Sequence, residues 1–195
     1  MNPLFTIGHS NHPIERLLEL LAKHAVSAVA DVRSHPFSRY NPQFNREELQ
    51  KTLKGAGIEY VFLGKELGAR SEDPSCFLDG KLQFDLLSRS GLFRSGLSRL
   101  QKGMERYLIA LLCAEKDPIL CHRMILVCRN MRSEAQEIRH ILEDGSLEDN
   151  RQSERRLMHS LGIPENHLFA KAEELIEKAY DLQGKRIAFE EKVTD

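Results

Sequence analysis

The stretch 107–128, YLIALLCAEKDPILCHRMILVC, decides the fold class. It opens with the unbroken apolar run 108–113, which is typical of a strand buried on both faces of a parallel sheet. A charged loop containing Pro118 follows. Apolar residues then recur at helical spacing over 124–131, namely Met124, Ile125, Val127, Cys128 and Met131. The stretch therefore predicts a central strand, a loop and a helix.

The triplet Cys121-His122-Arg123 stands where this loop becomes the helix. Its expected place is just beyond the carboxyl end of the central strand, where parallel α/β sheets bind their ligands. A helix N-terminus attracts anions and favours a thiolate over a thiol. The triplet is therefore the first candidate for a functional site.

Outward from this stretch, apolar segments alternate with helical patterns. Strands are expected at 4–7, 28–32, 58–63 and 138–142, and helices at 13–23, 45–55, 82–87 and 92–103. Asn45 followed by Glu48 predicts a capping-box start for the second of these helices. The alternation predicts an α/β fold, with a mostly parallel sheet of about five strands and helices on both faces.

The composition changes after Gly145, where charged residues and helical patterns replace strand patterns. We expect an α/β domain over residues 1–145 and a helical C-terminal extension over 146–195 that packs on it. Its two helices are expected at 152–161 and 165–180, and no strand is expected in it.

Composition excludes several classes of protein. The chain has 195 residues, of which 41% are hydrophobic and 29% charged, and its formal net charge is -1. This predicts a soluble globular protein whose overall charge does not attract nucleic acid. No segment is long and apolar enough to span a membrane. Four cysteines and no secretory signal at the start of the chain predict a reducing, cytoplasmic location. The oligomeric state is not predicted.

Right-handed crossovers should place the loops after the parallel strands at one edge of the sheet. These loops are 8–12, 31–40, 64–70 and 113–123. Their meeting at one edge is the main structural prediction.

The same loops carry a resemblance to a known family. The segments concerned are Thr6–Ser10, Asp31–Arg33 with Pro36 and Ser38, Gly57–Tyr60 before Leu63-Gly64 and Leu67-Gly68, Leu112–Glu115, Cys121–Arg123, His140-Ile141 and Asp144-Gly145. They resemble the DUF488 family of bacterial and archaeal proteins. The resemblance implies a compact α/β domain with these loop residues as its signature. It implies no reaction, since the family name records an unknown function.

The main hypothesis is an enzyme acting on a phosphate-bearing or other anionic substrate, such as a nucleotide or nucleic acid. Its catalytic candidates are His9, Asp31, Glu115 and Cys121. His9 and Asp31 are acid–base candidates, Glu115 is a second carboxylate at the edge, and Cys121 is a nucleophile or a ligand. The opposing interpretation makes Cys121 a small buried hydrophobic residue and joins Asp31 and Arg33 in a salt bridge.

The candidates for substrate binding are six residues of the same loops. Gly8 would let the backbone approach a ligand, and Ser10 would bind an oxyanion. Arg33 and Arg123 would hold the anion. His122 and Ser38 complete the set of Gly8, Ser10, Arg33, Ser38, His122 and Arg123.

Two alternatives stay open. One is a non-catalytic module that binds a small anionic ligand or nucleic acid in the same pocket. The other is a zinc-stabilised domain built from Cys113, Cys121, His122 and His9. Because the gap between the two cysteines is not a zinc-knuckle spacing, no residue is assigned as a metal ligand, and no cofactor is identified. The motifs of simple ATPases, dinucleotide enzymes, zinc proteases and α/β-hydrolases are absent from the sequence.

Overall fold

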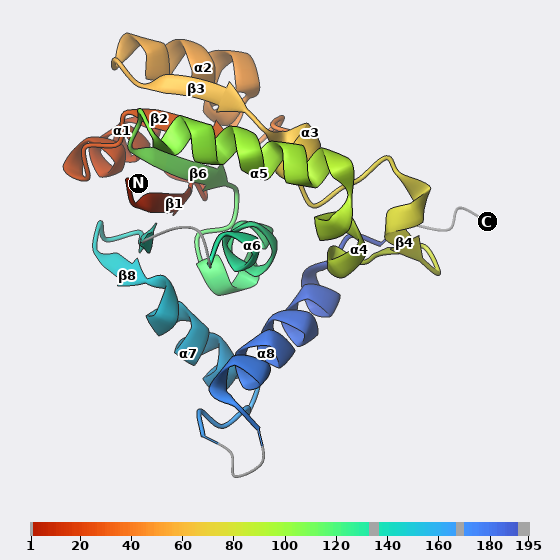
Figure 1. Ribbon diagram of the computed structural model, residues 1–195. Coiled ribbons are helices and arrows are strands. Elements are labelled where there is room, and N and C mark those ends of the chain that lie inside the picture. The colour runs from red at the N-terminus through yellow and green to blue at the C-terminus, as the bar shows by residue number, and fades with distance from the viewer. Residues whose placement is uncertain (1, 133–136, 167–169, 191–195) are drawn as a thin grey trace.

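The computed structural model describes residues 2–132, 137–166 and 170–190. Its main sheet has six strands in the order β3-β2-β6-β1-β7-β8, and the first five run parallel. Figure 1 shows the helices arranged around these strands. The strands are β1 Leu4–Gly8, β2 Ala28–Asp31, β3 Glu59–Phe62, β6 Ile109–Cys113, β7 Ile138–Ile141 and β8 Leu147–Asp149. The predicted α/β class with a mostly parallel sheet is confirmed.

The strand count differs from the prediction because of β8. This strand pairs antiparallel with β7 through a tight turn at Gly145, whose φ is +82°. Its three residues, Leu147, Glu148 and Asp149, show no apolar pattern, so the expectation that no strand follows residue 145 was wrong. The division into residues 1–145 and 146–195 stays a prediction, and β8 belongs to the sheet of the first part.

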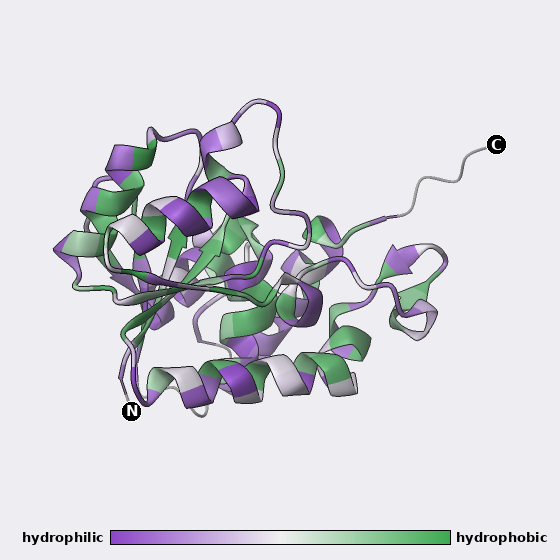
Figure 2. Cartoon of the chain, turned by 90° about the horizontal axis from the view of Figure 1, so that it is seen from above, coloured by the Kyte–Doolittle hydropathy of each residue, from purple (hydrophilic) through white to green (hydrophobic). Residues whose placement is uncertain are grey.

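Helices cover both faces of the sheet. One face packs against α1 Ile14–Lys23 and α2 Arg46–Gly55, and the other against α5 Gly91–Met104 and the C-terminal helices. Figure 2 shows mainly hydrophobic strands inside helices that carry both hydrophobic and hydrophilic residues. The remaining helices of the second face are the π-helix η4 Arg123–Cys128, α6 Arg129–Met131, α7 Asn150–Ser160 and α8 Ala172–Ile187.

Short elements join these layers. They are the helices α3 Gly64–Leu67 and α4 Phe84–Arg89, the hairpin of β4 Phe77–Leu78 and β5 Lys81–Leu82, and the 3-10 turns η1 Pro42–Phe44, η2 Pro74–Cys76 and η3 Pro118–Leu120. None of the described helices is long and apolar enough to cross a membrane.

Two helix starts differ from the predictions. The side chain of Asn45 does not cap α2, because its Oδ1 instead accepts a hydrogen bond of 2.7 Å from the backbone N–H of Ser38. The predicted capping box at Asn45 was therefore wrong. The last helix, expected over 165–180, spans Ala172–Ile187. Residues 167–169 of the expected helix lie outside the described residues.

The carboxyl ends of the central strands form one rim. In the register of the sheet Gly8 lies beside Cys113, and the backbone N–H of His9 donates to the Cys113 carbonyl at 2.9 Å. Strand β1 is followed by α1 on one face, whereas its neighbour β6 is followed by η4 on the other. Adjacent parallel strands whose connections leave to opposite faces open a crevice at their carboxyl ends.

Gly8 is required for steric reasons at this rim. A Cβ added there would lie 1.9 Å from the carbonyl oxygen of Glu115 and 2.8 Å from Cα of Lys116. The glycine therefore lets another part of the chain approach β1, and not a ligand as the sequence suggested.

We predict that Gly8→Ala lowers the free energy of unfolding by about 2 kcal/mol, because backbone atoms must move to admit the methyl group. Urea denaturation measures the change. The matched control is Gly55→Ala at the end of α2, where a Cβ meets nothing within 4 Å. Equal midpoints for the two variants would contradict the steric argument.

Candidate functional site

A cavity of about 440 Å³ lies at this rim of the sheet. Three of the four predicted loops, those after β2, β3 and β6, meet there, and Ile187 and Phe189, at and after the end of α8, also line it. The lining residues are Arg33, Ser34, His35, Phe37, Ala69, Arg70, Cys113, Ala114, Glu115, Leu120, Cys121, His122, Ile187 and Phe189. The loop after β1 lines an adjoining cavity of about 370 Å³, which shares Arg33, His35, Phe37, Ala114 and Glu115 with the first.

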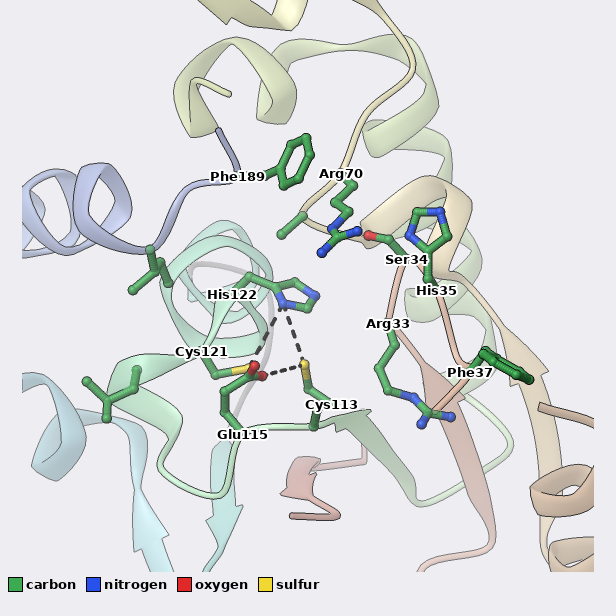
Figure 3. A pocket seen from close by; sticks show the side chains of 14 residues that line it. Arg33, Ser34, His35, Phe37, Arg70, Cys113, Glu115, Cys121, His122 and Phe189 are labelled. Carbon is green, nitrogen blue, oxygen red and sulfur yellow. Dashed lines mark hydrogen bonds between the residues drawn. The ribbon is translucent and has the colours of Figure 1, made fainter. Parts of the chain in front are cut away.

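Two thiols, one imidazole and one carboxylate converge at one end of the larger cavity. Nδ1 of His122 lies 3.6 Å from Sγ of Cys113 and 4.0 Å from Sγ of Cys121. Oε2 of Glu115 lies 3.2 Å and 3.3 Å from the same two sulfur atoms. Figure 3 shows these side chains pointing toward one another, with Arg70 and Phe189 on the opposite side of the cavity. We call Cys113, Glu115, Cys121 and His122 the thiol cluster.

The orientation of His122 is set by the backbone. Its Nε2 lies 3.0 Å from the carbonyl oxygen of Val32, and because a carbonyl only accepts, Nε2 must carry the hydrogen. The other nitrogen, Nδ1, therefore turns toward the two sulfur atoms. This ring position needs both strand β2, which ends before Val32, and the loop after β6.

The thiol cluster separates the proton affinities of its two cysteines. Burial opposes ionisation of Cys121, but the hydrogen bond from the Cys113 thiol, the Arg123 guanidinium and His122 lower its pKa well below the ordinary value. The same hydrogen bond to Cys121, with burial, raises the pKa of Cys113. Burial opposes the charged form of His122, but its contact with Cys121 raises its pKa. The cluster thus makes Cys121 the more acidic thiol of the pair.

Arg123 does not reach the cavity. Its guanidinium is fully buried and donates to the carbonyl oxygens of Glu115 and Lys116, the latter at 2.9 Å, and to the Thr6 hydroxyl at 3.2 Å. All these partners are neutral acceptors. The expectation that Arg123 binds an anion in the cavity is therefore wrong. Its guanidinium instead holds the loop that carries Glu115.

A hydrogen-bonded chain, which we call the polar relay, runs from Arg123 into the C-terminal helices. The Thr6 hydroxyl contacts Nδ1 of His140 at 2.8 Å, and Nε2 of His140 contacts Oδ1 of Asn150 at 3.1 Å. Asn150 then donates to Glu154 at 2.7 Å, and the Tyr180 hydroxyl donates to the same carboxylate oxygen at 2.9 Å. Among the described residues no buried side-chain nitrogen or oxygen lacks a partner.

Asp31 and Arg33 form the internal ion pair that the sequence left open. Arg33 donates to both carboxylate oxygens of Asp31, at 2.9 Å from Nε and 2.6 Å from the terminal nitrogen, and the Tyr60 hydroxyl donates to Asp31 at 2.8 Å. The Asp31 side chain is fully buried and that of Arg33 is 9% exposed. Arg33 therefore touches the cavity with a charge that is already neutralised, and Asp31 is not placed to act as a base there.

His9 lies apart from the thiol cluster. Its Nδ1 donates to the Ser10 carbonyl at 2.8 Å, its Nε2 accepts from Arg33 at 3.0 Å, and its ring stacks on Phe44 at 4.2 Å between centroids. Burial, aided by the charge of Arg33, lowers the pKa of His9 to about 4. Asp31 does not orient His9 directly, because Arg33 stands between them.

The two candidate serines line the smaller cavity. Ser38 accepts hydrogen bonds from the backbone N–H groups of Tyr40 and Asn41, at 3.2 and 3.1 Å, and so holds its own loop. Ser10 adopts a left-handed backbone with φ +49°. Within the described part of the chain, neither hydroxyl forms a hydrogen bond to the thiol cluster.

Sequence reasoning missed Arg70 and Phe189. The guanidinium of Arg70 lies 4.7 Å from the centre of the Phe189 ring, and within the described part of the chain it forms no ion pair. Arg70 stands in a loop that was flagged, so its charge was a usable signal. Phe189 follows α8 by two residues and is distant in sequence from every loop of the rim, so no sequence pattern points to it.

The fold and the rim define a class: a parallel α/β domain whose strand-end loops carry a thiol cluster beside a cavity. A family model matches residues 13–129, and the chain belongs to the DUF488 family, whose description is a domain of unknown function. The matched segment includes the whole thiol cluster. Searches of curated proteins and of solved structures gave no match.

Proposed function

We propose that the protein is an enzyme that acts on a small substrate with an anionic group, and that the thiol cluster is its reacting centre. The observation that carries this proposal is the convergence of two thiols, one imidazole and one carboxylate at the end of a cavity. Groups with perturbed pKa values that gather in a cleft are typical of reacting centres. The cavity volume is also in the range of small-molecule sites.

The opposite wall of the cavity supplies positive charge. Arg70 is exposed, and among the residues that the structure describes its guanidinium contacts the Phe189 ring and forms no ion pair. His35 lines the same cavity. We assign the substrate anion to Arg70, in place of Arg33 and Arg123, whose guanidinium groups are engaged within the protein. A planar guanidinium suits a phosphate or a carboxylate.

The mouth of the cavity supplies apolar surface. Phe37 is 72% exposed and Leu120 is 55% exposed, and both line the cavity. Exposed apolar side chains beside a cationic group favour a substrate that joins an aromatic or apolar part to its anion. A mononucleotide has this chemistry, and an aromatic side chain can stack on its base.

The test uses adenosine 5′-monophosphate as the probe in calorimetric titrations. Saturable binding is expected for the natural chain, with affinity lowered about tenfold in Arg70→Met, because one charge-assisted contact is lost. The control is Arg89→Met on α4, an exposed arginine that lines neither cavity, and its affinity should not change.

Turnover is tested separately on a panel of nucleotides and phosphate esters. Glu115→Gln is expected to keep the probe affinity and to lose turnover. Absence of binding in the natural chain, or identical affinity in the two arginine variants, would contradict the anion assignment. If the natural chain binds the probe but turns over no member of the panel, the protein is a binding module and the enzyme assignment is overturned.

A further inference from the structure

We propose that Cys113, Cys121 and His122 bind a divalent metal ion of the zinc type, with the fourth coordination position open to the cavity. The inference deepens the proposed function, on which it rests for the use of that open position. It concerns the described residues, among which these three donor atoms all lie within 4.8 Å of one another.

The donor spacing fits tetrahedral coordination. Bonds of about 2.3 Å to sulfur and about 2.0 Å to nitrogen place a sulfur and a nitrogen ligand about 3.6 Å apart, and two sulfur ligands about 3.8 Å apart. The two sulfur–nitrogen distances here are 3.6 and 4.0 Å. The two sulfur–nitrogen distances are thus close to those of a tetrahedral site, and the two sulfur atoms, which lie within 4.8 Å of each other, need to approach by at most about 1 Å.

The imidazole is prepared for coordination. Nε2–H of His122 is fixed by the Val32 carbonyl, so the Nδ1 lone pair is directed at the space between the sulfurs. Histidine ligands of metal ions commonly donate their second N–H to a backbone carbonyl in this way.

The number of donors favours an open site. Structural zinc sites have four protein ligands, whereas catalytic sites have three and leave one position to water or substrate. Within residues 2–132, 137–166 and 170–190 the cluster of close donors contains three, and all three line the cavity. This distinguishes the site from the zinc-stabilised structural domain that the sequence left open.

Glu115 is placed to assist such a site. Its Oε2 now accepts from both thiols. Metal binding removes the thiol protons, so the carboxylate loses both donors beside the open position. A water bound there can donate to Glu115, which makes this carboxylate a positioning group for that water.

The experiment measures metal in the full chain purified without chelators, and after loading with Zn²⁺ or Co²⁺ and removal of excess. About one equivalent is expected, and the Co²⁺ form should show an intense thiolate-to-cobalt absorption band. Cys113→Ser, Cys121→Ser and His122→Ala should each lower the retained metal by about tenfold or more. Cys76→Ala and Cys128→Ala are the controls, because both cysteines are buried outside the cluster, and they should retain the metal.

A second measurement does not depend on variants that fold. Alkylation followed by mass spectrometry should show Cys113 and Cys121 protected by Zn²⁺ and exposed to reagent after chelation. A chain that retains no Zn²⁺ or Co²⁺, or that is isolated with a Cys113–Cys121 disulfide, overturns the inference. Metal retention combined with loss of the Arg70-dependent probe binding would uphold the metal site and overturn the proposed function, and the reverse pattern would overturn the metal site alone.

Discussion

Arg123→Met is expected to lower the free energy of unfolding by about 4 kcal/mol, because it leaves one buried and two partly buried acceptors without a donor. Arg123 is fully buried and supplies the carbonyls of Glu115 and Lys116 and the Thr6 hydroxyl. Each unsatisfied acceptor costs about 1–3 kcal/mol, and removal of the buried charge recovers part of the total. Methionine has a volume similar to that of arginine, so the substitution creates little cavity. The loss of stability therefore reports mainly the lost hydrogen bonds.

Urea denaturation at neutral pH checks this expectation. Arg123→Lys should be intermediate, since an ammonium group cannot present the same fork to separated acceptors. Arg139→Met is the control, because the Arg139 side chain is 40% exposed and pairs with Glu137 at the surface. Its effect should stay within about 1 kcal/mol. If Arg123→Met were as stable as this control, the buried hydrogen bonds would not hold the loop.

Acid should destabilise the fold through His140 before most carboxylates titrate. Burial, aided by the charge of Arg123, lowers the pKa of His140 to about 4 from an ordinary value of 6.5. Between these pH values the unfolded chain binds the proton and the folded chain does not, so stability falls as pH falls. The loss approaches about 3 kcal/mol when pH reaches 4, with a slope of about 1.4 kcal/mol per pH unit.

The measurement is the free energy of unfolding at a series of pH values from 7 to 4. In His140→Gln the free energy of unfolding should fall less steeply with pH, by about 1.4 kcal/mol per pH unit, which is the contribution of one titrating proton. The glutamine amide can keep hydrogen bonds to Thr6 and Asn150 but does not titrate. His9, with its pKa lowered to about 4, contributes a second slope of the same sign in both proteins. The control is His159→Gln, an exposed histidine on α7. Parallel curves for the natural chain and His140→Gln would refute the assignment.

Much of the fold was predictable because the parallel strands are short apolar runs with clear turn signals. The run 108–113 contains β6, and the rule for right-handed crossovers placed the loops after the parallel strands at one edge. The strand β8 was not predictable, because Leu147–Asp149 owes its strand conformation to pairing with β7 and not to its own pattern. Tertiary pairing overrides weak local preference in such edge strands.

The candidate site was predictable as a set of loops and less so as a set of contacts. The direction of the Arg123 side chain depends on the π-helix η4, which begins at that residue. The spacing of apolar residues in the sequence does not distinguish a π-helix from an α-helix. Arg33 and Asp31 stand two residues apart in the chain, which favoured the ion pair now observed. The contributions of Arg70 and Phe189 depend on where α8 ends, which is a packing result.

The polar relay has a consequence for the evolution of the family. The matched family segment ends at residue 129, and His140 lies beyond it together with its partner Asn150 and with Glu154 and Tyr180 of α7 and α8. In a homologous chain without these two helices, Nε2 of this histidine would lose both its protein acceptor and the helices that cover it. The histidine would then have no partner at that nitrogen to select for it, so presence of the helices and retention of the histidine should co-vary.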